Sequence, residues 1–160
     1  MRLSILSIGK MKSGPERELL ERYLVRSEKA GRQIGIQGVT AQDWPESREA
    51  RAGERMASEA GQLIAALRPG GYAITLDETG RDMTSRDFAE LLKAALEAGR
   101  PEVSLMIGGP DGHGEAVRQR ADAMIRFGRL TWPHQLVRML AAEQLYRAIT
   151  ILTGHPYHRD

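Results

Sequence analysis

The sequence of 160 residues predicts an α/β fold in which helices cover both faces of a parallel sheet. Three observations support this prediction. Strand-like and helix-like segments alternate along the whole chain, as they do in βα units. The strand-like segments lack a polar face, which is typical of strands buried on both sides. No internal repeat or linker divides the chain, so residues 1–160 are expected to form one domain that ends in a short tail, residues 154–160.

The predicted strands are short runs rich in apolar and β-branched residues. The first, RLSILSI, begins directly at the N-terminus and is followed by a loop at Gly9. The second is weaker and precedes a polar loop over residues 40–50. The strands are expected at residues 2–8, 33–39, 72–77, 102–107 and 124–130.

The predicted helices carry recognisable start and stop residues. Pro15 opens the first helix and Gly31 closes it. Thr84 or Ser85 can cap the third helix, which runs to Leu96. The other helices are expected at residues 51–67, 115–123 and 133–152.

Composition excludes several classes of function. The absence of cysteine excludes disulfides, thiolate catalysis and cysteine-ligated metal centres, and it agrees with a cytoplasmic location. No apolar run is long enough for a membrane span, and no signal peptide opens the chain. A net charge of +2 is only mildly basic. Arginine dominates the basic residues, which agrees either with phosphate recognition or with a compositional bias.

Ligands of open α/β sheets bind at the carboxyl ends of the strands. Three late loops leave such ends: LDETGRD from Leu76, GGPDGHG from Gly108, and the segment from Leu130 to Pro133. The glycines of the second loop would let backbone amides approach a ligand. Dinucleotide and P-loop spacings are missing, and the segment Pro110-Asp111-Gly112 is explained equally well as a simple tight turn.

The last helix and the tail hold the remaining candidates. His134 and Arg138 share one helix face beside the third loop, where a functional and a structural role are equally supported. Glu143 and Arg147 are better explained as a stabilising pair on an exposed face. In the tail GHPYHRD, histidine and tyrosine can stack on an unpaired base, and arginine can hold a phosphate. Two histidines without a carboxylate are weak evidence for a metal site.

Taken together, five segments resemble SPOUT methyltransferases of the RlmH type, and the resemblance runs in order over nearly the whole chain. They are Ile8-Gly9-Lys10, LDETGRDMTSRDFA at 76–89, IGGPDG at 107–112, LTWPHQLVRMLAAEQLYRA at 130–148 and HPYHR at 155–159. The resemblance implies a C-terminal trefoil knot, which no pattern argument would find because knots are exceptional. It also implies a homodimer.

The resemblance further implies methyl transfer from S-adenosyl-L-methionine to N3 of a pseudouridine in a hairpin loop of 23S rRNA, within the assembled 70S ribosome. The implied cofactor contacts are Leu76, Gly108, Gly109, Gly128, Arg129, Leu130, Thr131, Trp132 and Pro133. His113 and Trp132 depart from the common pattern, which has apolar and aliphatic residues at these positions.

N3 must lose its proton, so a general base or stabilisation of the developing anion is expected to help. The candidate catalytic residues are His134, Arg138, Tyr157, His158 and Arg159. Arginine would act on a carbonyl or phosphate oxygen rather than as a base. Arg138 is also a candidate anchor for the nucleic acid or for the cofactor carboxylate. In a dimer the tail would complete the site of the other subunit.

Three other functions compete with this interpretation. One is a SPOUT enzyme that acts on tRNA, and another is a ribosome-binding module without catalysis. The third, a small-molecule enzyme with a nucleotide cofactor, is poorly supported because the dinucleotide fingerprint is missing.

Overall fold

The computed structural model describes residues 1–158, and over this range five parallel strands form one sheet with the order β2-β1-β4-β3-β5. The strands are β1 (Arg2–Ile8), β2 (Gly38–Trp44), β3 (Tyr72–Asp82), β4 (Glu102–Ile107) and β5 (Ala123–Arg126). The helices are α1 (Pro15–Gly31), α2 (Ala52–Ala65), α3 (Ser85–Glu97), α4 (Glu115–Arg120) and α5 (His134–Leu152), with a short 3-10 turn η1 (Arg32–Ile34). The prediction of a parallel α/β sheet is therefore confirmed.

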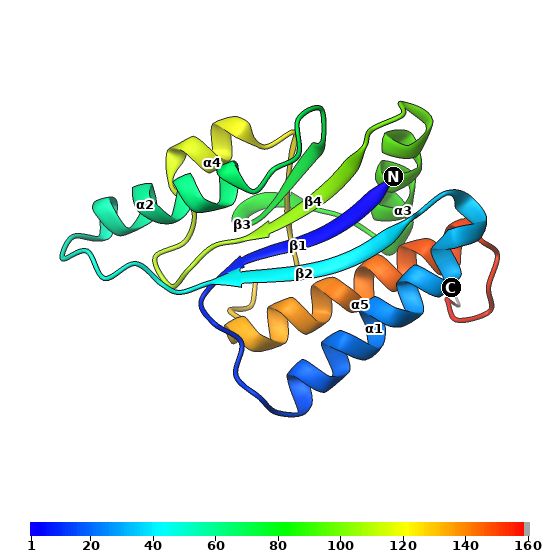
Figure 1. The fold of residues 1–160 in the computed structure, drawn as a ribbon, viewed down its shortest axis with the longest axis horizontal. Helices are drawn as coiled ribbons and strands as arrows, with labels where there is room; N and C mark the ends of the chain where they lie inside the picture. The colour runs from blue at the N-terminus through cyan, green and yellow to red at the C-terminus, as the bar shows by residue number, and fades with distance from the viewer. Residues whose placement is uncertain (159–160) are drawn as a thin grey trace.

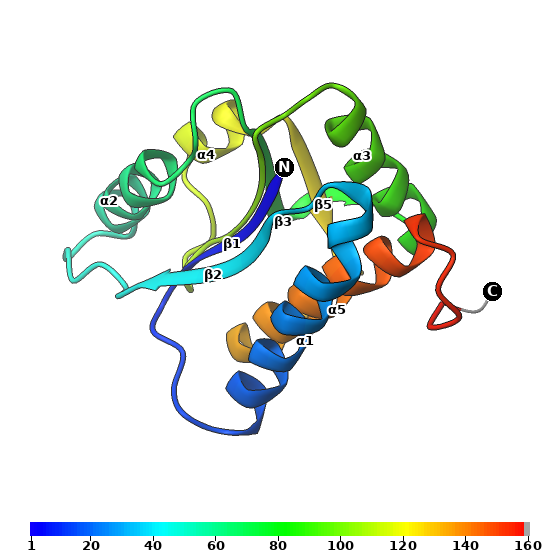
Figure 2. The same ribbon diagram turned by 45° about the vertical axis from the view of Figure 1, so that its right-hand side comes forward.

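Helices cover both faces of the sheet. Helices α2 and α4 lie on one face, and α1, α3 and α5 lie on the other (Figure 1, Figure 2). Successive residues of β1 alternate between the two layers, as the period of two requires. Leu3 and Ile5 belong to the core under α1, α3 and α5, whereas Leu6 and Ile8 belong to the core under α2 and α4. The continuous apolar pattern of this strand follows from burial on both sides.

The second strand lies later in the sequence than predicted. Residues 32–34 form η1, and Gly35 turns the chain with a φ of +85°. The strand β2 then covers Gly38–Trp44 and pairs with β1 along its whole length. It is an edge strand, and Thr40 and Gln42 are exposed on it. Its polar residues therefore gave no strand signal, and the loop predicted over residues 40–50 begins only after Trp44.

The segments around the carboxyl edge differ from the prediction in length. The helix predicted over 115–123 ends at Arg120, and the strand predicted over 124–130 ends at Arg126. The strand β3 instead runs on to Asp82, because a register shift after Leu76 lets Arg81 and Asp82 pair again with β5. Residues 127–133 are consequently a loop rather than part of a strand.

The described chain contains no candidate for a membrane-spanning helix. Within residues 1–158, no helix is both long enough and apolar enough to cross a bilayer.

Candidate functional site

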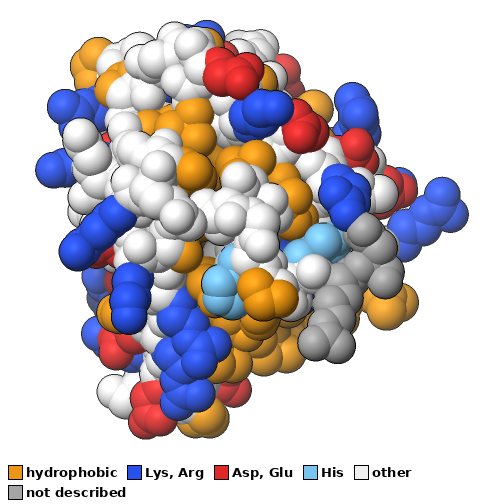
Figure 3. Space-filling view, turned by 90° about the vertical axis from the view of Figure 1, so that its right-hand side faces the viewer, with side chains coloured by type: hydrophobic (Ala, Val, Ile, Leu, Met, Phe, Trp, Pro, Cys, Tyr) orange, Lys and Arg blue, Asp and Glu red, His pale blue; other side chains and the backbone are white. Residues whose placement is uncertain are grey.

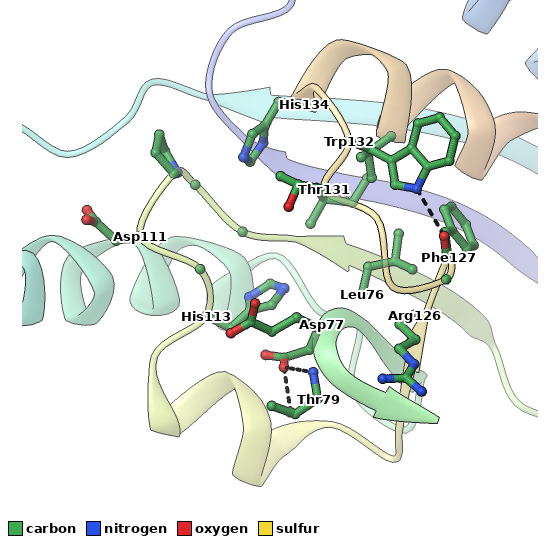
Figure 4. A pocket seen from close by; sticks show the side chains of 18 of the residues that line it. Leu76, Asp77, Thr79, Asp111, His113, Arg126, Phe127, Thr131, Trp132 and His134 are labelled. Carbon is green, nitrogen blue, oxygen red and sulfur yellow. Dashed lines mark hydrogen bonds between the residues drawn. The ribbon is translucent and has the colours of Figure 1, made fainter. Parts of the chain in front are cut away.

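The three segments named from the sequence enclose one cavity of about 600 Å³ (Figure 4), but the first of them, residues 76–82, belongs to β3 rather than to a loop. The walls of the cavity come from residues 76–79 of β3, from the end of β4 and the loop after it, from the loop after β5, and from the start of α5. Of the predicted cofactor residues, Leu76, Gly108, Gly109, Gly128, Arg129, Leu130, Thr131 and Trp132 line it. Pro133 is not part of this lining and instead occupies the N-cap position of α5.

The glycine loop after β4 is a tight turn that also forms a wall of the cavity. The Gly112 amide donates to the Gly109 carbonyl at 2.9 Å, and Gly112 has a φ of +81°. A Cβ on Gly108 would lie 2.9 Å from the carbonyl oxygen of Gly112. The two interpretations of this segment are therefore compatible, since the turn itself brings bare backbone to the cavity.

Asp77 also lies in the wall of the cavity, although the sequence did not point to it as a site residue. Its Oδ1 accepts from the Thr79 amide at 2.9 Å and from the Thr79 hydroxyl at 2.6 Å, and its Oδ2 accepts from Arg118 Nε at 2.9 Å. Burial alone would raise the pKa of the Asp77 carboxyl, but the bonds from Thr79 and Arg118 outweigh it and hold that pKa below its usual value. Asp followed two residues later by Thr after a strand is the signal that could have indicated this turn.

His113, the departure from the family pattern, lies in the wall of the cavity with only 4% of its surface exposed. Neither ring nitrogen makes a hydrogen bond with good geometry. Burial lowers the pKa of His113 below its ordinary value, although the Asp77 carboxylate and the carbonyls of Leu76 and Met106 act in the opposite direction. The ring therefore serves as a neutral wall at neutral pH.

The loop over residues 127–133 closes the cavity towards α5. The Trp132 indole N–H donates to the Phe127 carbonyl at 3.0 Å, which folds the loop back on itself (Figure 4). Gly128 allows this fold with a φ of +87°. Leu130 nevertheless remains 75% exposed and Trp132 40% exposed. This part of the wall therefore presents apolar surface outwards.

The two candidates at the start of α5 separate in the structure. His134 lines the cavity and is half-buried. Burial and the nearby Arg138 lower the pKa of His134, with a weaker opposite effect from Glu46 and Glu59. Arg138 lies behind the cavity, is 3% exposed, and donates from Nη2 to the Ile8 carbonyl at 2.6 Å. In this position Arg138 joins α5 to the end of β1 and is not part of the cavity lining.

Glu143 and Arg147 form the helix pair expected from their spacing, but the pair is not exposed and also anchors the tail. Glu143 is only 8% exposed. Its Oε1 accepts from Arg147 Nε at 2.9 Å and from the Tyr157 hydroxyl at 3.1 Å, and its Oε2 accepts from Gln144 at 2.7 Å. A buried carboxylate needs such partners, because an unpaired charge would be costly there.

The ring of Tyr157 completes the attachment of the tail to α1 and α5. It packs edge-on against Tyr146 at 4.7 Å between centroids, and its hydroxyl lies 3.2 Å from that of Tyr23. Arg147 stacks over the ring at 5.0 Å, and its Nη1 lies 3.4 Å from Nδ1 of His158. Arg159 falls outside the described residues. Figure 3 shows histidine, apolar and basic side chains gathered on this face of the molecule.

Within one chain, the tail and the cavity lie against different parts of α5. His134 opens this helix, whereas Glu143, which holds Tyr157, lies nine positions further along. At 1.5 Å of rise per residue this separation is about 13 Å. Within residues 1–158, no position after Val137 lines the cavity. Of the described candidates, Tyr157 and His158 are therefore not brought to the cavity that His134 lines within one chain.

A parallel α/β sheet with a glycine-lined cavity at its carboxyl edge is common to several classes of enzyme, and comparison with known proteins identifies the class. The sequence profile described as "Predicted SPOUT methyltransferase" matches residues 1–158. The chain therefore belongs to the SPOUT methyltransferase family, as its motifs indicated.

Within this family the chain is similar to curated proteins of the same length. It is 49% identical to ribosomal RNA large subunit methyltransferase H from Brucella anthropi, over all of both chains. It is 48% identical to the protein of that name from Rhizobium meliloti, over 99% of each chain.

Solved structures support the fold. A probable methyltransferase from Bordetella pertussis Tohama I superposes with a TM-score of 0.52 and 15% identity over 92% of this chain and 95% of the other. A probable methylase family protein from Haemophilus influenzae Rd KW20 gives the same TM-score at 11% identity, over 99% of this chain and 70% of the other. The trefoil knot stays a prediction.

Proposed function

We propose that the protein transfers a methyl group from S-adenosyl-L-methionine to N3 of a pseudouridine in 23S rRNA. The observation that carries this proposal is that the three loops predicted to hold the cofactor meet around one cavity in a member of the SPOUT family. The names of relatives that are nearly half identical over their full length favour ribosomal RNA of the large subunit as the substrate.

The cavity suits a nucleoside-type cofactor with a charged side chain. Its volume of about 600 Å³ is in the range of small-molecule sites. Leu76, Ile107 and Trp132 offer apolar surface for a base, and the turn from Gly109 to Gly112 brings backbone groups to the wall. S-adenosyl-L-methionine, when bound, supplies an activated methyl group, so the main task of the protein is to place the acceptor in line with it.

The proton on N3 of the pseudouridine needs an acceptor, and His134 is the candidate that the geometry favours. It is the only one of the described candidate catalytic residues, His134, Arg138, Tyr157 and His158, that lines the cavity. Since its pKa is lowered, the imidazole is neutral at neutral pH and can accept a proton.

Tyr157 is not suited to be the base. Burial, its bond with Tyr23 and the charge of Glu143 raise the pKa of Tyr157, so its hydroxyl remains a donor. Its role in the proposal is to hold the tail in place, so that His158 and Arg159 meet the RNA.

A homodimer would bring the two parts of the site together. In one chain the tail is held at Glu143, about 13 Å of helix rise away from His134. A second copy that places its tail over the cavity of the first would complete the site. A mixed dimer of one tail-deleted chain and one chain altered in the glycine loop tests this arrangement, because shared sites predict partial recovery of activity. No recovery would exclude sharing.

The target is proposed to be the 70S ribosome in the cytoplasm rather than free RNA. A net charge of +2 on 160 residues provides little non-specific attraction for phosphates, so the shape of a folded particle would supply much of the recognition. Nanomolar binding of the isolated hairpin at physiological salt would contradict this inference.

The test is a transfer assay with labelled S-adenosyl-L-methionine on unmodified ribosomes, isolated large subunits and naked rRNA, with the product mapped by mass spectrometry. Label on a single pseudouridine, chiefly in assembled ribosomes, is the expected result. Absence of label on all three substrates, with the cofactor still bound, would point to tRNA as the substrate. In the same assay, His158→Ala and Arg159→Ala should lower transfer far more than cofactor binding, and unchanged activity in both would remove the tail from catalysis.

A further inference from the structure

Helix α2 contacts the glycine loop from outside the cavity through Arg55. The Nε of Arg55 donates to Oδ2 of Asp111 at 2.7 Å, and its Nη2 donates to Oδ1 at 3.1 Å. Asp111 is the central side chain of the turn between Gly109 and Gly112. In Figure 4 its carboxylate points out of the cavity, away from Thr131 and Trp132. The two parallel bonds fix the orientation as well as the distance of this carboxylate.

The same guanidinium also holds the segment that precedes α2. Its Nη1 donates to the carbonyl of Glu49 at 3.0 Å and to that of Ala50 at 3.1 Å. One side chain therefore connects the helix, the loop before the helix and the turn on the cavity. Only the planar fork of arginine offers donors in directions that suit all three partners, and lysine would not replace it.

Glu59 adds a second contact one helical turn further along α2. Its Oε1 accepts from the Ser47 amide at 2.9 Å, and the residue is 3% exposed. Its Oε2 lies so close to Gly109 that a Cβ on that glycine would be 2.7 Å away. Arg55 and Glu59 thus present one face of α2 to the glycine loop, and the backbone of Gly109 rests against that face.

We propose that Arg55 is a positioning residue for the methyl donor: by clamping Asp111 it fixes the backbone of residues 108–112 in the geometry that receives S-adenosyl-L-methionine. This inference rests on the proposed function, which assigns the cavity to that cofactor. A turn that contains three glycines would otherwise sample many conformations. Ordering this turn before binding lowers the entropic cost of binding. Arg55 does not line the cavity, so its loss weakens affinity without removing a direct contact to the ligand.

The test compares charge-neutralising variants by calorimetric titration with S-adenosylhomocysteine. Arg55→Gln and Asp111→Asn should each raise the dissociation constant about fivefold, the upper end of what a partly exposed ion pair contributes. The double variant should be no weaker than either single variant, because the two side chains act as one unit. The matched control is Arg51→Gln, since Arg51 precedes the same helix, is 83% exposed at its side chain and forms an ion pair with Glu54 at 3.6 Å. The dissociation constant of this variant should equal that of the wild type.

The outcomes separate this inference from the proposed function. Unchanged affinity in Arg55→Gln, or additive losses in the double variant, would overturn the clamp while leaving the cofactor assignment intact. Failure of the wild type itself to bind S-adenosylhomocysteine would remove the cofactor assignment. Hydrogen exchange then tests the clamp without a ligand. The amides of Gly108, Gly109, Asp111 and Gly112 should exchange faster in Arg55→Gln than in Arg51→Gln, and equal rates would overturn the inference.

Discussion

Replacing Gly80 by alanine is expected to destabilise the protein by about 2 kcal/mol. A Cβ at this position would lie 2.5, 2.6 and 2.7 Å from the carbonyl carbon, oxygen and nitrogen of Ile125. Ordinary contact begins at 3.4 Å, so β3 and β5 must separate by about 0.9 Å (3.4 − 2.5). Because the neighbour is backbone rather than a flexible side chain, no rotamer change relieves the clash. Overpacking of this kind lowers the free energy of unfolding by about 1–3 kcal/mol.

Urea unfolding of Gly80→Ala beside Gly61→Ala measures this effect with a matched control. Gly61 lies inside α2 and is exposed to solvent, and a Cβ added to it would meet no neighbouring atom within 4 Å. Alanine there should stabilise the protein by about 0.5–1 kcal/mol, because glycine is unfavourable inside helices. The same chemical change is thus expected to have opposite signs at the two sites. Equal stability of Gly80→Ala and the wild type would refute the reasoning about the close approach of β3 and β5.

Three further changes probe the tail and the cavity. Glu143→Gln should lower the free energy of unfolding by about 2 kcal/mol, since Arg147 and Tyr157 lose their charged acceptor. The amides of His155, Tyr157 and His158 should then exchange faster, and unchanged exchange would contradict the anchoring role. His113→Leu should reduce the pH dependence of urea unfolding. The pKa of His113 in the folded state lies below its ordinary value of 6.5, so the unfolded state binds more protons at acidic pH. The stability of the wild type therefore falls as the pH drops below about 6.5. A variant as pH-sensitive as the wild type would argue against this burial effect. His134→Ala should lower the rate of methyl transfer far more than the affinity for S-adenosylhomocysteine. The rate of the wild type should rise as the pH passes through the pKa of His134, because the ring then loses its proton. A rate independent of pH between about 5 and 7.5 would argue against His134 as the base.

The sequence predicted most of the fold where burial on both faces left a simple pattern. RLSILSI and the strand before Gly108 are such cases, and both have the predicted bounds. Strand β2 was misplaced because an edge strand tolerates polar residues and so loses the apolar signal. The strand expected to reach residue 130 ends at Arg126, since Phe127 and Leu130 serve the cavity loop rather than the sheet. Apolar content predicts burial or a binding surface, but it does not distinguish between them.

Helix spacing predicts which residues share a face, but it does not reveal what covers that face. Glu143 and Arg147 have the spacing of an ordinary surface pair, and Tyr157, which contacts both, follows only after the helix has ended. The same limitation explains why His134 and Tyr157 looked like parts of one site. Each belongs to a recognisable motif, yet their separation along α5 depends on where the tail docks. The tail docks because Tyr157 finds a buried carboxylate, a neighbouring hydroxyl and an aromatic partner at one place. These contacts hold Tyr157 away from the cavity of its own chain, and this separation is the observation behind the proposal of a homodimer.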